Sequence, residues 1–244
     1  MLLKLVVILT IVAFNFAFTQ SREEKSTAPT PGETKSEVPE LREYHKVIHK
    51  LWHVMWAEKN IKGIAQMYND IESGAISVKN AKLPGILRDK EEMWNENVNS
   101  LMRIVGELKE AIKSNDSLMI LKKTEELHSQ YEKLVKIIKP KIRELDEFHQ
   151  VLYVLYHYYV PEYNVEAIRS VLPSLREKME KLKASKLPGN LKAKEDDFKK
   201  RLNELDKAVD DFVKLFNGKF DEKIVKEKME ALHSRYKLVE KLVE

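Results

Sequence analysis

The chain has 244 residues, 43% of them hydrophobic, which is enough for one large or two small packed domains. Its 43 Lys and Arg residues nearly balance 39 Asp and Glu residues, and the two signs are interspersed along the chain, which argues against a nucleic-acid-binding surface. The absence of cysteine excludes disulfides, cysteine-ligated zinc and haem attached through a CxxCH motif.

The N-terminus has the features of a secretory signal peptide. Lys4 precedes an uncharged apolar run over residues 5–18, and Ala17 and Thr19 are small residues at the two positions that a signal peptidase reads. We therefore predict a signal peptide over residues 1–19, an exported protein in the periplasm or outside the cell, and no stable membrane span after cleavage. An uncleaved membrane anchor is the alternative, although the run is short for a span of ~20 residues.

The rest of the chain divides into a linker and two similar units. Residues 20–38 are rich in Ser, Thr, Pro, Glu and Lys, which predicts a disordered linker. An offset of 104 residues then places the sequence Lys-Leu-Pro-Gly at 82–85 on the same sequence at 186–189. We predict a tandem duplication, with repeat 1 over 39–140 and repeat 2 over 141–244.

Within each unit the apolar residues recur at helical spacing, and no segment alternates with the period of a strand. In repeat 1 the helices are expected from Pro39 to Ala57, from the cap Asn60 to about Gly74, from the turn at Pro84-Gly85 to about Lys113, and from the cap at Asn115-Asp116-Ser117 to Lys139. Repeat 2 follows the same plan, with Asn164 as a cap, Pro188-Gly189 as a turn and Asn217-Gly218 as the last break. Four helices with short connections pack as an up-down-up-down bundle. The predicted fold is all-α, a tandem duplication of an antiparallel four-helix bundle with eight helices in total.

The first helix of each unit is apolar or aromatic almost all the way round. This holds for residues 47–56 (VIHKLWHVMW) and for residues 151–160 (VLYVLYHYYV). A helix that is hydrophobic on all sides is buried on more than one side. We therefore expect these helices to pack between the two bundles or to form a homodimer, with a thick bundle core as the alternative.

Six of the seven histidines are matched between the repeats. The pairs are His45 with His149, His53 with His157, and His128 with His233. His49 has no match, because Tyr153 replaces it. The first and last helices of such a bundle are antiparallel neighbours, which places His128 within reach of His49 or His53.

Neutral imidazole is a good ligand for Zn²⁺, Cu²⁺ and Ni²⁺. We therefore predict a transition-metal site shared by the first and last helix of each bundle. Its candidate ligands are His45, His53 and His128 in repeat 1 and His149, His157 and His233 in repeat 2, with His49 as a further possibility. The alternative is that these histidines pack on aromatic rings and form hydrogen bonds across the helices.

The last helix carries a His-x-x-Tyr step in both units, at His128 to Tyr131 and at His233 to Tyr236. With export, four helices and about a hundred residues per unit, each repeat resembles the cytochrome b562 and cytochrome c′ family. The resemblance implies a haem b between the first and last helices, with His128 and His233 as iron ligands. The chain departs from this family in lacking CxxCH and in the place of the histidine, about three turns from the helix end.

Three classes of function remain open at this point. They are an exported metal-handling protein, a non-catalytic protein that binds an unknown protein partner, and a b-type haem electron carrier. The sequence contains no nucleophile–base arrangement, Gly-rich phosphate loop or nucleotide fingerprint, so we do not expect a metal-independent enzyme.

Overall fold

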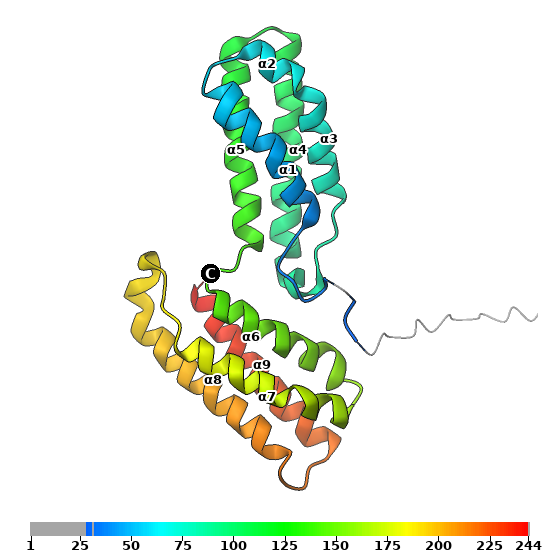
Figure 1. Cartoon of the computed structure of the whole chain (residues 1–244), viewed down its shortest axis with the longest axis vertical. Helices are drawn as coiled ribbons and strands as arrows, with labels where there is room; N and C mark the ends of the chain where they lie inside the picture. Colours follow the sequence, from blue (N-terminus) through cyan, green and yellow to red (C-terminus); the bar gives the residue numbers. More distant parts are fainter. Residues whose placement is uncertain (1–27, 31, 244) are drawn as a thin grey trace, which may run out of the picture.

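The computed structural model describes residues 28–30 and 32–243, so the predicted signal peptide lies outside the described residues. Within this part of the chain the regular elements are all helical and no strand is present (Figure 1). The all-α prediction is therefore confirmed. None of the described helices is both long and apolar enough to cross a membrane.

The first bundle consists of four helical arms around one core. Its elements are α1 (Pro39–Lys50), the π-helix η1 (Leu51–Trp56), α2 (Ile61–Gln66), α3 (Tyr68–Asn80), the 3-10 helix η2 (Gly85–Lys90), α4 (Glu91–Lys113) and α5 (Ser117–Ile138). The long helices α4 and α5 lie side by side, and α1 packs against α3 (Figure 1). Their apolar faces meet in a core in which Leu51, Leu101 and Leu127 are almost fully buried.

The second bundle has the same order of arms and its own core. Its elements are α6 (Arg143–Val154), the π-helix η3 (Leu155–Tyr159), α7 (Val165–Lys183), the 3-10 helix η4 (Gly189–Lys194), α8 (Glu195–Leu215) and α9 (Glu222–Val243). Phe148, Phe212 and Leu232 are fully buried in this core. Here α7 is one continuous helix, whereas the corresponding arm of the first bundle is divided into α2 and α3 at Met67.

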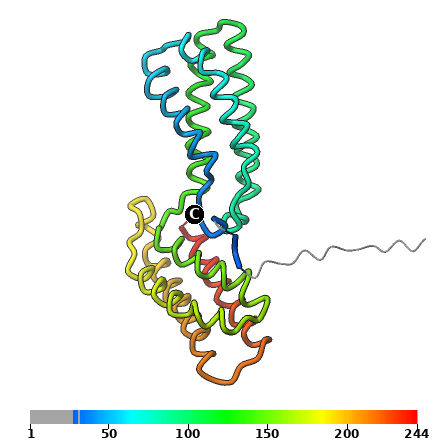
Figure 2. The backbone as a smooth tube through the Cα atoms, turned by 45° about the vertical axis from the view of Figure 1, so that its right-hand side comes forward, coloured from blue at the N-terminus to red at the C-terminus, as the bar shows by residue number. Residues whose placement is uncertain are grey.

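The two bundles lie end to end along the long axis of the molecule, as Figures 1 and 2 show. The chain passes from α5 to α6 through residues 139–142, and α9 ends beside this junction. A small apolar cluster of Ile86, Leu87 and Tyr153 joins the bundles, separate from the two main cores. The predicted packing of residues 151–160 between the bundles therefore agrees with the position of Tyr153.

The predicted end of the second helix near Gly74 is wrong, because α3 continues to Asn80. Glycine inside a helix costs about 1 kcal/mol relative to alanine. A Cβ atom on Gly74 would lie 2.2 Å from Cδ2 of Tyr44, so the ring of this buried tyrosine occupies the space that a side chain would need. Gly74 is therefore a packing residue and not a helix end.

Three expected helix starts are confirmed by their side-chain caps. Asn60, Asp116 and Asn164 each accept a hydrogen bond from the backbone N–H three residues further on, at 2.8, 3.0 and 3.0 Å. Such caps satisfy one of the N–H groups that the first turn of a helix leaves without a partner. These short polar residues explain why the helix starts were easier to predict than the end of the second helix.

The predicted disordered linker over residues 20–38 is too long at its C-terminal end. Residues 20–27 lie outside the described part of the chain. Beyond them, the Ser36 hydroxyl donates a hydrogen bond to the Asp146 carboxylate at 2.5 Å, and Val38 is only 2% exposed. This segment therefore crosses the junction and contacts the second bundle before α1 begins.

Candidate functional site

The first and last helices of each bundle bring the repeat-matched rings together. In the first bundle the imidazole of His128, on α5, stacks on the indole of Trp52, on η1, with ring centroids 4.2 Å apart and planes 9° apart. Trp52 stacks in turn on Trp56 at 4.1 Å. The indole N–H of Trp56 donates to the carbonyl of Leu121 at 3.1 Å. The three rings form a column that fixes η1 against α5.

A second matched pair, His45 and Tyr131, links α1 to α5 in the same bundle. Nδ1 of His45 lies 3.1 Å from the hydroxyl oxygen of Tyr131, which is hydrogen-bond distance. Burial, with a smaller contribution from Glu132, raises the pKa of Tyr131 to about 12. The hydroxyl therefore keeps its proton at neutral pH and can donate it to the imidazole.

The second bundle makes the equivalent contacts. His233 stacks on Tyr156 with ring centroids 3.9 Å apart and planes 12° apart. His149 stacks on Tyr236 at 4.5 Å and 23°. The residues that the sequence offset matches thus have matching neighbours in the two bundles.

His53 and His157 both lie on π-helical turns, in η1 and η3. In η3, for example, the N–H of Val160 donates to the carbonyl of Leu155, five residues back, at 2.9 Å. A π turn contains one more residue than an α turn, and such turns occur frequently at functional sites. The π-helical end of the first helix is therefore a candidate position for a ligand-binding side chain.

Three histidines form a row on the exposed side of the first bundle. We call His45, His49 and His53, which follow one another at intervals of four residues along α1 and η1, the histidine row. The ring centroids of His45 and His49 are 5.8 Å apart, and those of His49 and His53 are 4.5 Å apart. All three side chains are exposed. His49 and His53 form no hydrogen bond with any other residue that the structure describes.

The corresponding row of the second bundle is covered by the first bundle. Tyr153 stands in the position of His49, is 1% exposed, and packs against the apolar residues of η2. The Arg88 guanidinium of η2 lies 3.2 Å from Nδ1 of His157, and its central carbon lies 5.1 Å above the Tyr153 ring. Rings that are exposed in the first bundle are thus packed in the second because η2 lies over them.

The junction keeps its histidines uncharged at neutral pH. Burial lowers the pKa of His157 to about 4, and the positive charge of Arg88 contributes to the same effect. Burial also lowers the pKa of His149 to about 4, against an opposing contribution from Glu240. With Arg88 donating to Nδ1, the neutral ring of His157 carries its proton on Nε2. Both imidazoles therefore pack as neutral rings, and that of His157 accepts the hydrogen bond from Arg88.

Charged groups also connect the two bundles. The ammonium group of Lys237 lies 2.7 Å from Oδ2 of Asp89, and the Glu33 carboxylate accepts hydrogen bonds from the hydroxyls of Tyr153 and Tyr158 at 2.7 and 2.5 Å. Burial alone would raise the pKa of Glu33, but these hydrogen bonds outweigh it and lower the pKa to about 2. The carboxylate is therefore ionised throughout the physiological range.

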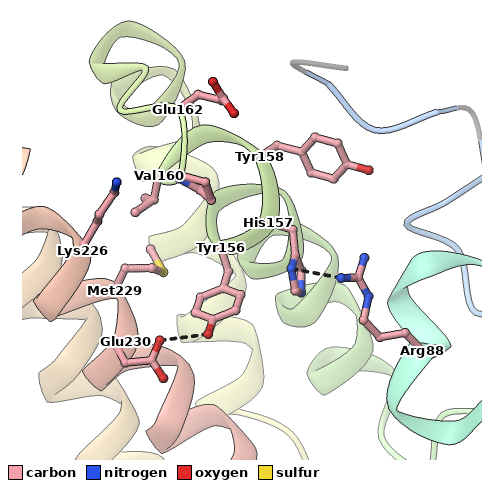
Figure 3. A pocket seen from close by; sticks show the side chains of 10 residues that line it. Arg88, Tyr156, His157, Tyr158, Val160, Glu162, Lys226, Met229 and Glu230 are labelled. Atoms are coloured by element: carbon pink, nitrogen blue, oxygen red, sulfur yellow. Dashed lines mark hydrogen bonds between the residues drawn. The ribbon is translucent and has the colours of Figure 1, made fainter. Parts of the chain in front are cut away.

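An open cleft of about 710 Å³ lies beside the junction, between η3, α9 and η2 (Figure 3). Figure 3 shows two hydrogen-bonded pairs among the side chains that line it. The Tyr156 hydroxyl donates to Glu230 at 2.8 Å, and Arg88 donates to His157. A ligand that binds through any of these four side chains would have to break these contacts, so the cleft is a weaker candidate than the histidine row.

The structure does not bring the predicted metal ligands of either bundle together in one group. Among the residues that it describes, no group of three or more His, Cys, Asp or Glu side chains could hold a metal ion. The rings of His157 and His233 are 6.5 Å apart in an edge-to-face arrangement, while His149 packs on Tyr236. The closest pair of imidazoles is His49 with His53 in the first bundle, and His49 is the histidine without a repeat match.

The haem that the family resemblance implies would meet packed side chains between the first and last helices. One face of the His128 ring is covered by Trp52, and His233 has the equivalent cover. The core next to His128 is filled, with Leu51 and Leu127 at 1% and 0% exposed. A haem between the first and last helices would have to displace these side chains, so we derive no electron-transfer step from this structure.

Two residues have positions that the sequence did not predict. His49 has no match in repeat 2, so the comparison of repeats ranked it last, although its four-residue spacing from His45 and His53 places all three on one helix face. Arg88 lies in a turn with no distinguishing pattern around it. Its contact with the second bundle depends on the relative position of the bundles, which helical periodicity does not contain.

The site is therefore defined by geometry inside this chain. The histidine row of the first bundle is exposed, and its counterpart in the second bundle is packed against η2. Comparison of the chain with protein-family models, with curated proteins and with solved structures finds no match.

Proposed function

We propose that the protein binds a transition-metal ion, Zn²⁺, Cu²⁺ or Ni²⁺, through His49 and His53 of its first bundle. The observation that carries this proposal is the distance of 4.5 Å between the centroids of these two exposed rings. With metal–nitrogen bonds of about 2.0–2.1 Å, the angle between the two bonds sets the distance between the ring centroids of two imidazoles on one ion. This distance is about 4.5 Å at a right angle and about 5.2 Å at the tetrahedral angle. The pair is therefore close to a two-imidazole chelate without movement of the backbone.

Two further histidines lie beside this pair. His45 follows in the row, with its ring 5.8 Å from that of His49. Burial lowers the pKa of His128, with smaller contributions from His53 and His45 and an opposing one from Glu132. The imidazole of His128 is therefore neutral at pH 7, which is the form that binds a metal ion. His45 would have to release Tyr131 in order to join, and His128 would have to leave its stack. We assign the ion to His49 and His53, which leaves the remaining coordination positions open to other ligands.

Two imidazoles with open positions form a site from which an ion can be exchanged. Together with the predicted export, this supports a non-catalytic metal carrier or sensor outside the cytoplasm. In this proposal the second bundle has a structural role, because its histidines stack on tyrosines and form the junction.

Titration of the purified, untagged protein with Zn²⁺, Cu²⁺ and Ni²⁺ by calorimetry tests the proposal. His49→Ala or His53→Ala should weaken binding about tenfold or more, or about 1.4 kcal/mol, because each removes one arm of the chelate. Lys50→Ala, on the same exposed turn, is the matched control and should bind like the wild type. Wild-type affinity in both histidine variants would refute the assignment.

A protein-interaction function is the second candidate, and a separate observation favours it. The first helix of the second bundle packs against η2, where Tyr153 forms one buried cluster with Ile86 and Leu87. The helix-one face of this fold can therefore bind a protein surface. A visible spectrum and metal analysis of the untagged protein separate the classes: a Soret band supports haem, bound metal supports the proposed carrier, and neither one after reconstitution supports the interaction protein.

A further inference from the structure

We infer that the metal ion is held between two copies of this chain, each of which supplies His49 and His53. The inference rests on the proposed function and adds the partner at the same site. It starts from an incomplete coordination sphere, because the first bundle places two exposed imidazoles together and the described residues contain no group of three possible ligands. A structural zinc site takes four protein ligands in tetrahedral geometry.

A two-fold axis through the ion completes this geometry with no new residue. In a symmetric dimer the same patch on both copies forms the interface, so the second copy contributes the same two imidazoles. Four histidines then surround one ion. From the centroid distance of 4.5 Å, each pair needs to open by only about 0.7 Å to reach the tetrahedral separation, which a small side-chain rotation provides.

The face around the pair is accessible to a second copy. In Figure 1 the chain rises along α1 to α2 at the end of the molecule that is farthest from the second bundle, so the second bundle does not cover η1. His53 stands between Trp52 and Val54, and Val54 is 39% exposed. Trp52 and Trp56 are half-buried, with their rings stacked on one another. A partner at this face would bury apolar and aromatic surface beside the metal.

The chain itself contains a precedent for docking at this face. The equivalent face of the second bundle is occupied by η2, and there the counterpart of His49 is Tyr153, which is 1% exposed. On the first bundle the face is open and the residue is a histidine. This position is thus a buried tyrosine, Tyr153, where η2 covers the helix, and an exposed histidine, His49, where the helix is open. This difference favours a second copy joined through metal.

Sedimentation velocity of the untagged protein, with Zn²⁺ and with a chelator, tests the inference. We expect a monomer with chelator and a species of twice the mass with zinc, saturating at one zinc per two chains. Zinc bound at one ion per chain by a monomer would overturn the dimer and leave the proposed function intact. The absence of binding of Zn²⁺, Cu²⁺ and Ni²⁺ in the calorimetric titration would overturn both.

Variants identify the ligands of the shared ion. The double variant His49→Ala/His53→Ala should remain monomeric at every zinc concentration, while its circular dichroism stays helical because alanine favours helix. His45→Ala, in the same row, should still form the zinc-dependent dimer. A dimer that persists in the double variant, or one that forms equally well in chelator, would refute the shared site.

Discussion

Acid should destabilise the second bundle more than the first, and His149 should account for a large part of this effect. The ring of His149 is half-buried on Tyr236, and burial lowers its pKa from 6.5 to about 4. One pKa unit corresponds to about 1.4 kcal/mol, so this difference corresponds to about 3 kcal/mol as an upper value. Replacement of His149 by Phe keeps a ring on Tyr236 and removes the titrating group.

The sign of the effect follows from the two states. Above pH 6.5 the ring is neutral in both the folded and the unfolded chain, so the free energy of unfolding does not depend on it. As the pH falls from 6.5 towards 4, the unfolded chain binds a proton that the folded chain does not bind, and stability is lost. Below about 4 both states are protonated and the loss is complete. His157 contributes in the same window, because its pKa is also lowered to about 4.

The two bundles can be followed separately in one denaturation experiment. The three tryptophans, Trp52, Trp56 and Trp94, all lie in the first bundle, so their fluorescence reports on that bundle, while circular dichroism reports on both. Urea unfolding followed by circular dichroism gives the free energy of unfolding at neutral pH and at pH near 4.5. The decrease between these two pH values should be smaller by about 2–3 kcal/mol in His149→Phe than in the wild type. The tryptophan transition of the variant serves as the internal control.

An unchanged pH dependence in His149→Phe would refute this reasoning. It would mean that the ring takes up its proton in the folded state at the same pH as in the unfolded chain. If His149→Phe is less stable than the wild type at neutral pH, that difference reports on packing. The prediction concerns only the change in the free energy of unfolding between the two pH values.

Two further predictions concern packing and the junction. Gly74→Ala should lower the free energy of unfolding by about 1–3 kcal/mol, because its Cβ would collide with the ring of Tyr44. Gly106→Ala, where a Cβ meets nothing within 4 Å, should raise it by about 0.5–1 kcal/mol, and chemical denaturation of both variants checks the contrast. Arg88→Ala should loosen the junction without unfolding either core, so limited proteolysis of the inter-bundle connection should become faster. Arg103→Ala, an exposed residue of α4, should leave the cleavage rate unchanged.

The helices could be predicted from the sequence because their signals are local. The apolar period and the polar caps at Asn60, Asp116 and Asn164 are written in a few neighbouring residues, and the structure places helix starts there. The end of the second helix was misplaced because Gly74 has a long-range reason, its contact with Tyr44. A glycine that accommodates a distant ring looks the same in sequence as a glycine that ends a helix.

The candidate site was predicted only in part, for a related physical reason. Comparison of the repeats selects residues that both bundles keep, and two of the three matched histidine pairs pack on aromatic rings in both bundles, as His128 does on Trp52 and His233 on Tyr156. Similarity between the halves therefore identifies shared packing. The exposed pair that we propose as the metal chelate includes His49, which the second bundle lacks.

The two bundles differ in sequence on both sides of the contact between η2 and the first helix of the second bundle. In the turn η2, Ile86 is 5% exposed at the junction, whereas its counterpart in η4 is the exposed Asn190. On the receiving helix, Tyr153 is buried under η2, whereas its counterpart is the exposed His49. An apolar turn thus meets an aromatic residue at this contact, whereas the corresponding residues of the other turn and the other helix, Asn190 and His49, are polar and exposed. His49 and His53 are therefore exposed on the first bundle, as the proposed metal-linked dimer requires.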